Sequence, residues 1–328
     1  KELLTYFNGT VLKNKLKSFF TKYWKYLAVS TACELNLFDF LKVPKTAKQV
    51  SDELSLYERT LFHLLEALVH MNFLTKKDNL YNINNLSMFL TEDHPESLKY
   101  ACLNWSKEHL SAWQELSYSI KTGKNAFEKI YNLSFFDYLD KNPQKLKDYH
   151  QAMYQYAKDD YQNLPNIIDF SKHNSIIDVG GGYGALINNI QLKYPSLKCI
   201  LFDLEKVIEN VSTTNIQKIG GSFFDTIPIK TDAIILSRIL HDWNDENALI
   251  ILKNCFDALT DNGILYVIEN CTDKTKIDIS LLSLNMAVIC ESYERSSKEY
   301  CSLANKMNFK FNQELTLNEL QTILIFKK

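Results

Sequence analysis

Short hydrophobic runs alternate with amphipathic stretches through the second half of the chain, from residue 175 onward. The runs predict β-strands at 175–179, 198–204, 232–237, 263–269 and 320–328. Apolar residues at helical spacing predict α-helices at 184–194, 245–259 and 296–309. Strands and helices that alternate at this length predict an α/β fold with a mostly parallel sheet and helices on both faces. Ligands of such sheets bind at the carboxyl ends of the strands.

The first part of the chain follows another pattern. Apolar residues recur at helical spacing over 21–43, and Pro44 ends that predicted helix. Two shorter helices are predicted at 46–56 and 58–74, and two short strands follow within 74–83. Three helices and a hairpin are the order of a winged-helix module, which binds DNA or serves in dimerisation and docking. A packing or dimer role is favoured by the apolar residues Tyr23, Trp24, Leu27, Val29, Leu35 and Phe38.

Between these two parts, residues 96–163 are predicted to form helices that are rich in large apolar side chains. The set comprises Trp105, Trp113, Phe127, Phe135, Phe136, Tyr149, Met153, Tyr154 and Tyr156. Ordinary core packing is expected for most of them, and a few are expected to face a pocket. Pro165 and Asn166 mark the change to the alternating pattern.

Charge and hydropathy exclude two classes of partner. The chain of 328 residues has a net charge of −2 and an isoelectric point near 6.4, so no strongly basic surface for nucleic acid is expected. The first fifty residues contain nine lysines against three acidic residues, which we interpret as a solvated helix face. No stretch of eighteen apolar residues occurs, so no membrane span is expected.

Seven cysteines are dispersed along the chain and form no C-x-x-C pair. This distribution is typical of reduced core thiols and predicts a cytoplasmic protein. Cysteine and histidine show no metal-ligand spacing, so no structural zinc is expected.

Glycine is concentrated in one place: four of the nine glycines are Gly180, Gly181, Gly182 and Gly184. They follow a predicted strand and precede a predicted helix, where a ligand can approach the backbone and the free N–H groups of a helix start. The stretch fits G-x-G-x-x-A, a dinucleotide pattern, and also D-x-G-x-G-x-G from Asp178, which suits S-adenosylmethionine. Nineteen residues after Gly184, Asp203 ends the next strand, where an acid can accept both ribose hydroxyls of a nucleoside. The residues alone leave both ligands open.

A candidate base follows a strand further along. His241 lies in ILSRILHDWNDENA, just beyond the strand 232–237, and a neutral imidazole there can take a proton from a hydroxyl. Glu269 ends the next strand and Glu294 precedes a helix, so either can orient the ring and stabilise its protonated form. The alternatives are a surface histidine before a helix N-cap and an ordinary capping glutamate.

Six stretches match one family in order and spacing over about 175–300: DVGGGYG, FDLEKVI, GGSFFDTIP, SRILHDWNDENA, LTDNGILYVIE and LNMAV…ERSSKEY. With them the chain resembles the small-molecule O-methyltransferases that use S-adenosylmethionine, the family of caffeate, hydroxyindole, and bacterial polyketide and phenazine O-methyltransferases. HDW is the most specific element. The resemblance implies a winged-helix-like dimerisation domain at 1–95 and a class I methyltransferase domain at 96–328. The latter divides into a helical acceptor-pocket region, 96–165, and a Rossmann-like core, 166–328.

The resemblance also implies roles for single residues. His241 matches the general base, and Glu269 and Glu294 match the acids that flank it. Cofactor contacts are implied for Gly180, Gly182, Asp203, Ser222, Phe223, Ser237 and Arg238. Positions that line the acceptor pocket are implied for Met153, Asn285 and Met286.

The chain departs from the family pattern in three places. Ser222 stands where many relatives have Asp, and Ser237 stands where plant members have Lys. Glu291 and Ser292, followed by Tyr293, replace the common Gly-Gly before the E-R-T segment. That loop borders the acceptor in the family, so its change bears on the identity of the substrate.

The implied activity is methyl transfer from S-adenosylmethionine to a hydroxyl, phenolic in type, of a small aromatic or polyketide-type acceptor. A homodimer is implied, and no metal, because the sequence shows no carboxylate cluster suited to one. Three alternatives stay open: an NAD-dependent oxidoreductase, a winged-helix regulator with a ligand-sensing domain, and a family member that binds the cofactor without methyl transfer.

Overall fold

The chain divides into two units, residues 1–106 and 107–328. A computed structural model describes residues 2–328, with side chains from Gly9 onward. The division lies later than residue 95 because helix α6 (Lys99–Asn104) belongs to the first unit. The buried Lys99 there donates to Asn36 and Asp39 at 2.6 and 2.9 Å, and Tyr26 donates to the carbonyl of Cys102 at 2.6 Å.

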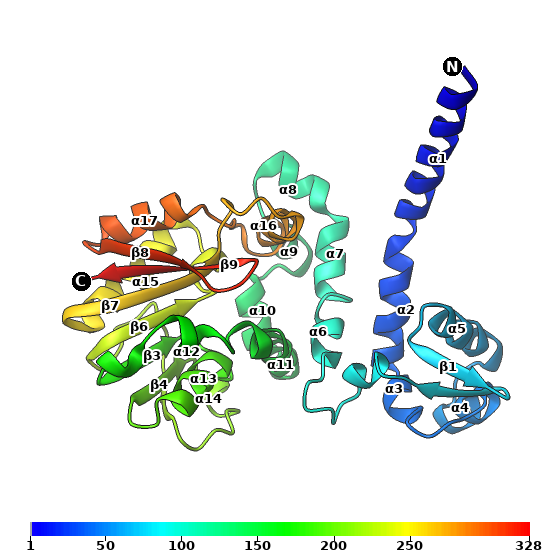
Figure 1. The fold of residues 1–328 in the computed structure, drawn as a ribbon, viewed down its shortest axis with the longest axis horizontal. Helices are drawn as coiled ribbons and strands as arrows, with labels where there is room; N and C mark the ends of the chain where they lie inside the picture. Colours follow the sequence, from blue (N-terminus) through cyan, green and yellow to red (C-terminus); the bar gives the residue numbers. More distant parts are fainter. Residues whose placement is uncertain (1) are drawn as a thin grey trace. The chain divides into compact units, whose positions relative to one another are not determined.

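The first unit has the predicted order of helices followed by a hairpin (Figure 1). Its other elements are α1 (Glu2–Phe20), α2 (Lys22–Glu34), α3 (Leu37–Phe40), α4 (Ala47–Leu54), α5 (Glu58–His70), β1 (Leu74–Lys77), β2 (Leu80–Ile83) and the 3₁₀ helix η1 (Ser87–Leu90). The prediction of one helix over 21–43 is wrong. Asn36 adopts a left-handed conformation with φ of 56° and separates α2 from α3, which an asparagine tolerates better than most residues.

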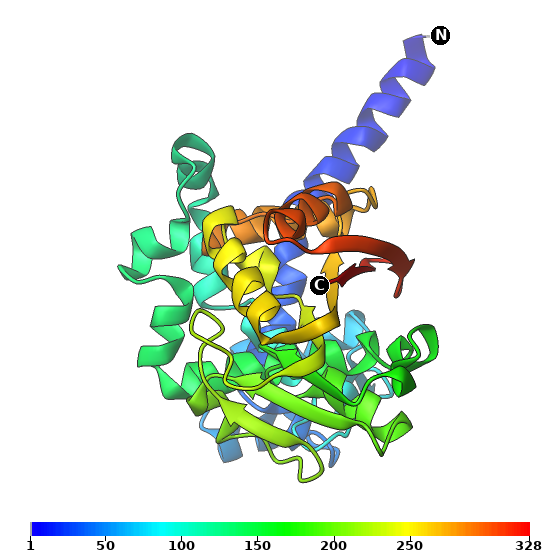
Figure 2. The same ribbon diagram turned by 90° about the vertical axis from the view of Figure 1, so that its left-hand side faces the viewer.

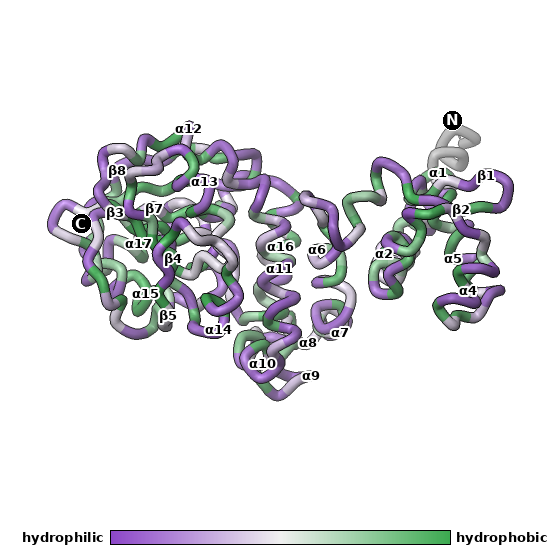
Figure 3. Tube along the Cα trace, turned by 90° about the horizontal axis from the view of Figure 1, so that it is seen from below, coloured by the Kyte–Doolittle hydropathy of each residue, from purple (hydrophilic) through white to green (hydrophobic). Residues whose placement is uncertain are grey.

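Local sequence explains the other boundaries of this unit. Thr46 and Gln49 form a reciprocal capping box that starts α4. Asp78 and Asn79 both have positive φ, which the tight turn between β1 and β2 requires. Hydrophilic and hydrophobic residues alternate along α4 and α5, as the tube in Figure 3 shows, and buried apolar residues of α2, α3, α4 and α5 form one core around Leu65.

The second unit contains a seven-stranded sheet in the order β5-β4-β3-β6-β7-β9-β8. Its strands are β3 (Ser175–Val179), β4 (Lys198–Asp203), β5 (Gln217–Gly220), β6 (Thr231–Ser237), β7 (Leu259–Asn270), β8 (Lys310–Thr316) and β9 (Gln321–Lys327). β5, β4, β3, β6 and β7 run parallel, and β9 pairs antiparallel with both β7 and β8. The predicted mostly parallel α/β sheet is confirmed, and β5 and β8 are additions that the hydrophobic pattern did not predict.

Helices cover both faces of this sheet, as Figures 1 and 2 show together. The helices are α12 (Leu164–Ile167), α13 (Ala185–Lys193), α14 (Glu205–Ile208), α15 (Asp245–Ala258) and α17 (Ser297–Lys306), with the 3₁₀ helices η2 (Phe170–Lys172) and η3 (Leu240–Asp242). Side chains alternate across each strand. Ile177 therefore packs with Leu252 of α15, whereas its neighbour Ile176 packs with Ile190 of α13 on the other face.

The remaining helices of this unit are α7 (Glu108–Gln114), α8 (Leu116–Thr122), α9 (Ala126–Tyr131), α10 (Phe135–Lys141), α11 (Pro143–Asp160) and α16 (Ile277–Cys290). Core packing is confirmed for Phe127 and Phe135, which are buried in a cluster that also contains Val288 and Ile289 of α16. No helix was predicted over 277–290, because apolar residues occur on all of its sides. Within the described part of the chain, no helix is both long enough and apolar enough to cross a membrane.

Candidate active site

Four parallel strands that lie side by side in the order β4-β3-β6-β7 carry polar or glycine residues at or just beyond their carboxyl ends. β3 leads into the glycine cluster, β4 ends at Asp203, β6 leads into Arg238, and Glu269 is the second-last residue of β7. Because these ends share one edge of the sheet, residues far apart in sequence meet there.

The glycine loop after β3 requires residues without a side chain. Gly180 has φ of +72°, and a Cβ on it would lie 2.5 Å from Cδ1 of Ile239. A Cβ on Gly181 would lie 2.5 Å from a carboxylate oxygen of Asp178. The backbone therefore lies closer to its neighbours than any larger residue allows. Asp178 itself is buried, and burial raises its pKa to about 7.

Asp203 is fixed beside this loop. Its Oδ2 accepts from the backbone N–H of Gly182 at 2.8 Å, and its Oδ1 accepts from the N–H of Leu204 at 2.7 Å. Each oxygen keeps a further lone pair for a ligand hydroxyl. Sequence reasoning missed His150 of α11, whose Nδ1 lies 3.5 Å from the place of a Cβ on Gly182. Burial lowers the pKa of His150, so its ring is neutral beside the acid.

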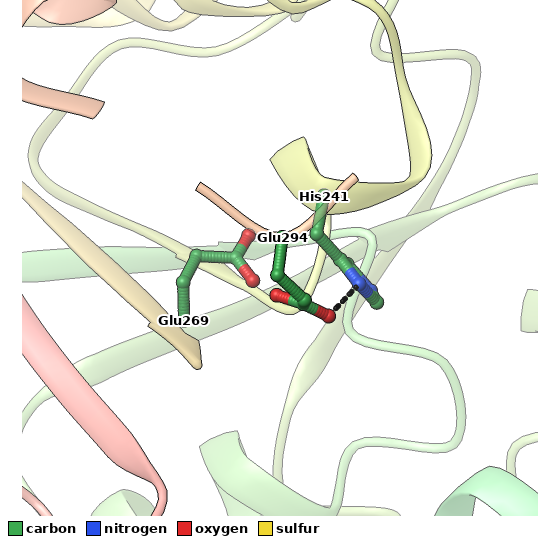
Figure 4. Close-up of side chains that lie close together, drawn as sticks. All are labelled: His241, Glu269 and Glu294. Atoms are coloured by element: carbon green, nitrogen blue, oxygen red, sulfur yellow. Dashed lines mark hydrogen bonds and ion pairs between the residues drawn. The ribbon is translucent and has the colours of Figure 1, made fainter. Parts of the chain in front are cut away.

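His241, Glu269 and Glu294 meet in the structure (Figure 4). Nδ1 of His241 lies 2.9 Å from Oε1 of Glu294, and all three side chains are buried. In Figure 4 the Glu294 side chain lies between the other two. The predicted pairing of the histidine with a carboxylate is thus present for Glu294, whereas Glu269 accepts hydrogen bonds from the backbone.

Glu269 instead stabilises the backbone that carries the histidine. Its Oε1 accepts from the N–H groups of Ile239 and Leu240 at 3.1 and 3.0 Å, and its side chain is fully buried. Its Oε2 accepts from Nη1 of Arg238 at 3.1 Å. This glutamate therefore ties the turn after β6 to the end of β7.

Arg238 pairs with both glutamates. Nη1 and Nη2 donate to the two oxygens of Glu294 at 3.2 and 2.8 Å, and Nη2 also lies 3.0 Å from Nδ1 of His241. Burial raises the pKa of Glu294, but the charge of Arg238 and the hydrogen bonds from His241 and Arg238 outweigh it and hold that pKa at about 2. The resemblance implied a cofactor contact for Arg238, and its position inside the acidic cluster is an addition that the sequence did not indicate.

Two residues of the loop after α16 donate hydrogen bonds to the backbone carbonyls of the histidine segment. Arg295 donates to the carbonyls of Leu240 and Trp243 at 2.9 and 2.8 Å. The hydroxyl of Ser292 lies 2.5 Å from the carbonyl of His241 and 3.0 Å from that of Trp243. Ser292 is 1% exposed, so one of the departures from the family pattern supports the histidine backbone.

The other cofactor candidates line the same edge of the sheet. The Phe223 ring packs edge-on against Trp243, and its Cε1 lies 3.4 Å from the place of a Cβ on Gly180. Ser222 accepts from the N–H of Phe224 at 3.2 Å, and Ser237 shares a 2.6 Å hydrogen bond with the hydroxyl of Tyr161. Their proposed contacts with a cofactor stay predictions.

The three acceptor-pocket candidates lie on two helices. Met153 is half-buried on α11, and Asn285 and Met286 are buried on α16. Oδ1 of Asn285 accepts from Nε1 of Trp113 at 2.7 Å. An indole N–H can only donate, so this bond fixes which end of the amide faces the tryptophan.

Three side chains that are far apart in the sequence come close enough in the structure to resemble a metal site. Donor atoms of His241, Glu269 and Glu294 lie within 4.8 Å of one another, and it is the one such group among the described residues. Arg238 donates to both carboxylates, so a guanidinium already compensates their charge. We assign no metal ion to the group, and a metal-independent reaction stays a prediction.

Two family models match the chain: an O-methyltransferase dimerisation domain over residues 18–93 and an O-methyltransferase domain over residues 113–310. Caffeic acid 3-O-methyltransferase 2 of Populus tremuloides is 34% identical over 247 residues, which are 72% of this chain and 67% of that protein. The crystal structure of LaPhzM superimposes with a TM-score of 0.92 at 26% identity, covering 96% of this chain and 99% of that one.

A third similar protein was solved with ligands. It is an O-methyltransferase from neocarzinostatin biosynthesis in complex with S-adenosylmethionine and 2-hydroxy-5-methyl naphthoic acid, with a TM-score of 0.79, 25% identity, and coverage of 92% of this chain and 95% of that one. The O-methyltransferase model alone spans more than half of the residues, with the glycine loop, His241 and both glutamates inside it. The chain therefore belongs to the S-adenosylmethionine-dependent O-methyltransferase family.

Proposed function

We propose that this protein methylates a hydroxyl of a small aromatic acceptor, with His241 as the general base. The observation that carries the proposal is the 2.9 Å contact between Nδ1 of His241 and Oε1 of Glu294, buried at the carboxyl edge of the sheet. Family membership favours the S-adenosylmethionine interpretation of the glycine loop over the dinucleotide interpretation, and an enzyme over a regulator.

This contact determines which nitrogen of His241 accepts the proton of the acceptor hydroxyl. When Nδ1–H donates to Glu294, the lone pair of Nε2 is free to take the proton of the acceptor hydroxyl. A phenol has a pKa near that of tyrosine, about 10, so removal of its proton makes the oxygen a much better nucleophile at neutral pH. Bound S-adenosylmethionine supplies a methyl group that its sulfonium already activates. Transfer of that group to the acceptor oxygen would leave the S–CH₃ electron pair on sulfur and the proton on His241.

The glycine loop and Asp203 fit the nucleoside part of that cofactor. The loop excludes side chains at Gly180 and Gly181, and Asp203 offers two oriented oxygens to ribose hydroxyls. Gly182 contributes the N–H that orients the acid. Ser222, Phe223 and Ser237 are assigned to the same cofactor on the family pattern.

Removal of the Asp203 carboxylate is expected to weaken binding of S-adenosylhomocysteine. Charge-assisted hydrogen bonds contribute about 1.5–3 kcal/mol, so Asp203→Ala should raise the Kd about 10- to 100-fold in isothermal titration calorimetry. Asp257→Ala is the matched control, since Asp257 is exposed on α15 and its carboxylate pairs with the exposed Lys253. Equal affinity of the two variants would rule out this role for Asp203.

Two observations support an aromatic acceptor: the ligand of a solved relative, and the side chains that α11 and α16 offer at the predicted acceptor positions. One solved relative was crystallised with a hydroxylated naphthoic acid. Here Met153 and Met286 offer apolar surface, and Asn285 presents its amide nitrogen away from Trp113 as a donor. We infer an acceptor that combines a flat apolar ring with an oxygen able to accept a hydrogen bond.

We also propose that the chain acts as a homodimer. Its first unit matches a dimerisation domain, and α1 and α2 expose large apolar side chains: Val11, Leu12, Leu16, Phe19, Phe20, Tyr23 and Trp24. Apolar patches of this kind mark protein interfaces.

Sedimentation velocity is expected to give the mass of two chains. Leu16→Asp combined with Phe20→Asp, at positions that are 55% and 64% exposed, should shift the protein toward the monomer. Leu192→Asp on α13, where Leu192 is 79% exposed, is the control that should leave the mass unchanged. A wild-type monomer at every concentration would refute the dimer.

A further inference from the structure

Arg238 is held in an unusual conformation inside the acidic cluster. It is not glycine, yet its φ is +57°, a conformation that costs most residues free energy. Its N–H donates to the carbonyl of Ile268 at 2.9 Å, which fixes the turn, and its guanidinium then reaches Glu269 and Glu294. Strained backbone retained at this point indicates that the position of the guanidinium matters.

The guanidinium also lies directly against the imidazole. Nη2 is 3.0 Å from Nδ1 of His241 and 2.8 Å from Oε1 of Glu294, while Nδ1 and Oε1 are 2.9 Å apart. A guanidinium stays protonated and can only donate, and an ionised carboxylate can only accept. A proton on Nδ1 is therefore drawn toward Glu294 and repelled by Arg238.

Three carboxylates lie around this histidine, from the loop after α16, from η3 and from β7. Glu294 lies at Nδ1, Oδ1 of Asp242 in η3 lies 3.4 Å from Nε2, and Glu269 of β7 is within 4.8 Å. Tyr149 of α11 and Cys290 of α16 lie near Asp242, and burial raises the pKa of both, so they stay neutral.

On their own these acids would hold His241 as an imidazolium, which cannot accept a proton. We infer that Arg238 is a positioning residue for the proposed base: its guanidinium compensates Glu269 and Glu294 and opposes a proton on the ring, so that His241 becomes a free base at a lower pH than the carboxylates alone would allow. This inference rests on the function proposed for His241. Burial and Arg238 lower the pKa of His241, whereas Asp242, Glu294 and Glu269 raise it, and the result is a pKa above the ordinary value. Arg238 therefore limits a rise that the carboxylates cause.

The test is the pH dependence of His241 in the full-length chain. Arg238→Gln removes the positive charge and is expected to raise the pKa of the ring by about one pH unit or more, followed by NMR of its Cε1 proton without substrate. His241→Gln identifies that resonance among the seven histidines. The acid limb of the kcat profile should move by the same amount. At a pH below the new midpoint kcat should fall about tenfold, and above it kcat should return toward the wild-type value.

Arg238→Lys keeps the charge and is expected to leave the midpoint near that of the wild type. The double variant Arg238→Gln/Glu269→Gln covers the case in which the single variant does not fold. It removes one charge of each sign, and the amide oxygen of Gln can still accept from the N–H groups of Ile239 and Leu240. The pKa of His241 is still expected to rise, because Arg238 affects it more than Glu269 does.

An unchanged or lower pKa of His241 in the variants without arginine would overturn the inference. So would a kcat that falls equally at every pH, because a merely structural role has no alkaline rescue. The NMR titration needs no turnover, so it separates this inference from the proposed function. A ring whose pKa rises while the kcat profile stays in place would sink the base role of His241 and leave the effect of Arg238 on the ring intact.

Discussion

Replacement of His241 by alanine is expected to lower kcat for methyl transfer about 10²- to 10⁴-fold, the usual contribution of a general base. The acceptor then has to lose its proton without the imidazole that is proposed to accept it. Initial rates of S-adenosylhomocysteine formation with a panel of phenols measure the effect. Affinity for S-adenosylhomocysteine should stay near the wild-type value, since the ring is not among the proposed cofactor contacts.

The matched control is His173→Ala. His173 is half-buried and shares a 2.8 Å hydrogen bond with the hydroxyl of Tyr266, but it precedes β3, at the end of the sheet opposite to the glycine loop. Its removal tests the loss of a partly buried imidazole without touching the cluster. Full turnover by His241→Ala on an acceptor that the wild type methylates would eliminate the proposed base.

Replacement of Glu269 by alanine is expected to lower the free energy of unfolding by about 3–5 kcal/mol. The side chain is fully buried, and its loss leaves the N–H groups of Ile239 and Leu240 without their acceptor and Arg238 with one carboxylate fewer. Glu269→Gln should cost less, because the amide oxygen can still accept from both N–H groups. Chemical denaturation at neutral pH measures both variants.

Glu319→Ala provides the baseline for that comparison. Glu319 is 90% exposed and lies 3.9 Å from Lys276, a separation at which an exposed ion pair contributes little. Its replacement should change the free energy of unfolding by less than about 0.5 kcal/mol. If Glu269→Ala is as stable as this control, Glu269 does not anchor the turn after β6.

Most strands and helices that bound the site were predictable, because their signals are local. The runs 175–179 and 232–237 are buried on both faces and read as continuous apolar strands. The helix over 277–290 was not predictable in this way, since it packs among the aromatic helices of its unit and is apolar all round. The break between α2 and α3 at Asn36 was not predictable either, because no glycine or proline marks that position.

The chemistry of the site divides in the same manner. The glycine cluster, Asp203, His241 and Glu269 can be named from sequence, because each lies at or just beyond the end of a strand of a parallel sheet and such ends converge. Glu294 precedes a helix and is named from the family pattern. The sequence does not show which glutamate contacts the ring, because Glu269 and Glu294 carry the same carboxylate and only side-chain distances distinguish them. The structure gives the 2.9 Å contact to Glu294 and turns Glu269 toward the backbone.

The sequence by itself determined the α/β class, the winged-helix order of the first unit, the family, and the identity of the candidate base. These features depend on hydrophobic periodicity and on short motifs, and both can be recognised within a continuous stretch of sequence. Only the tertiary structure placed Arg238 between Glu269 and Glu294 and the hydroxyl of Ser292 against the carbonyl of His241. Electrostatic balance in a buried cluster depends on distances of about 3 Å between residues far apart in the chain, and no spacing along the sequence encodes those distances.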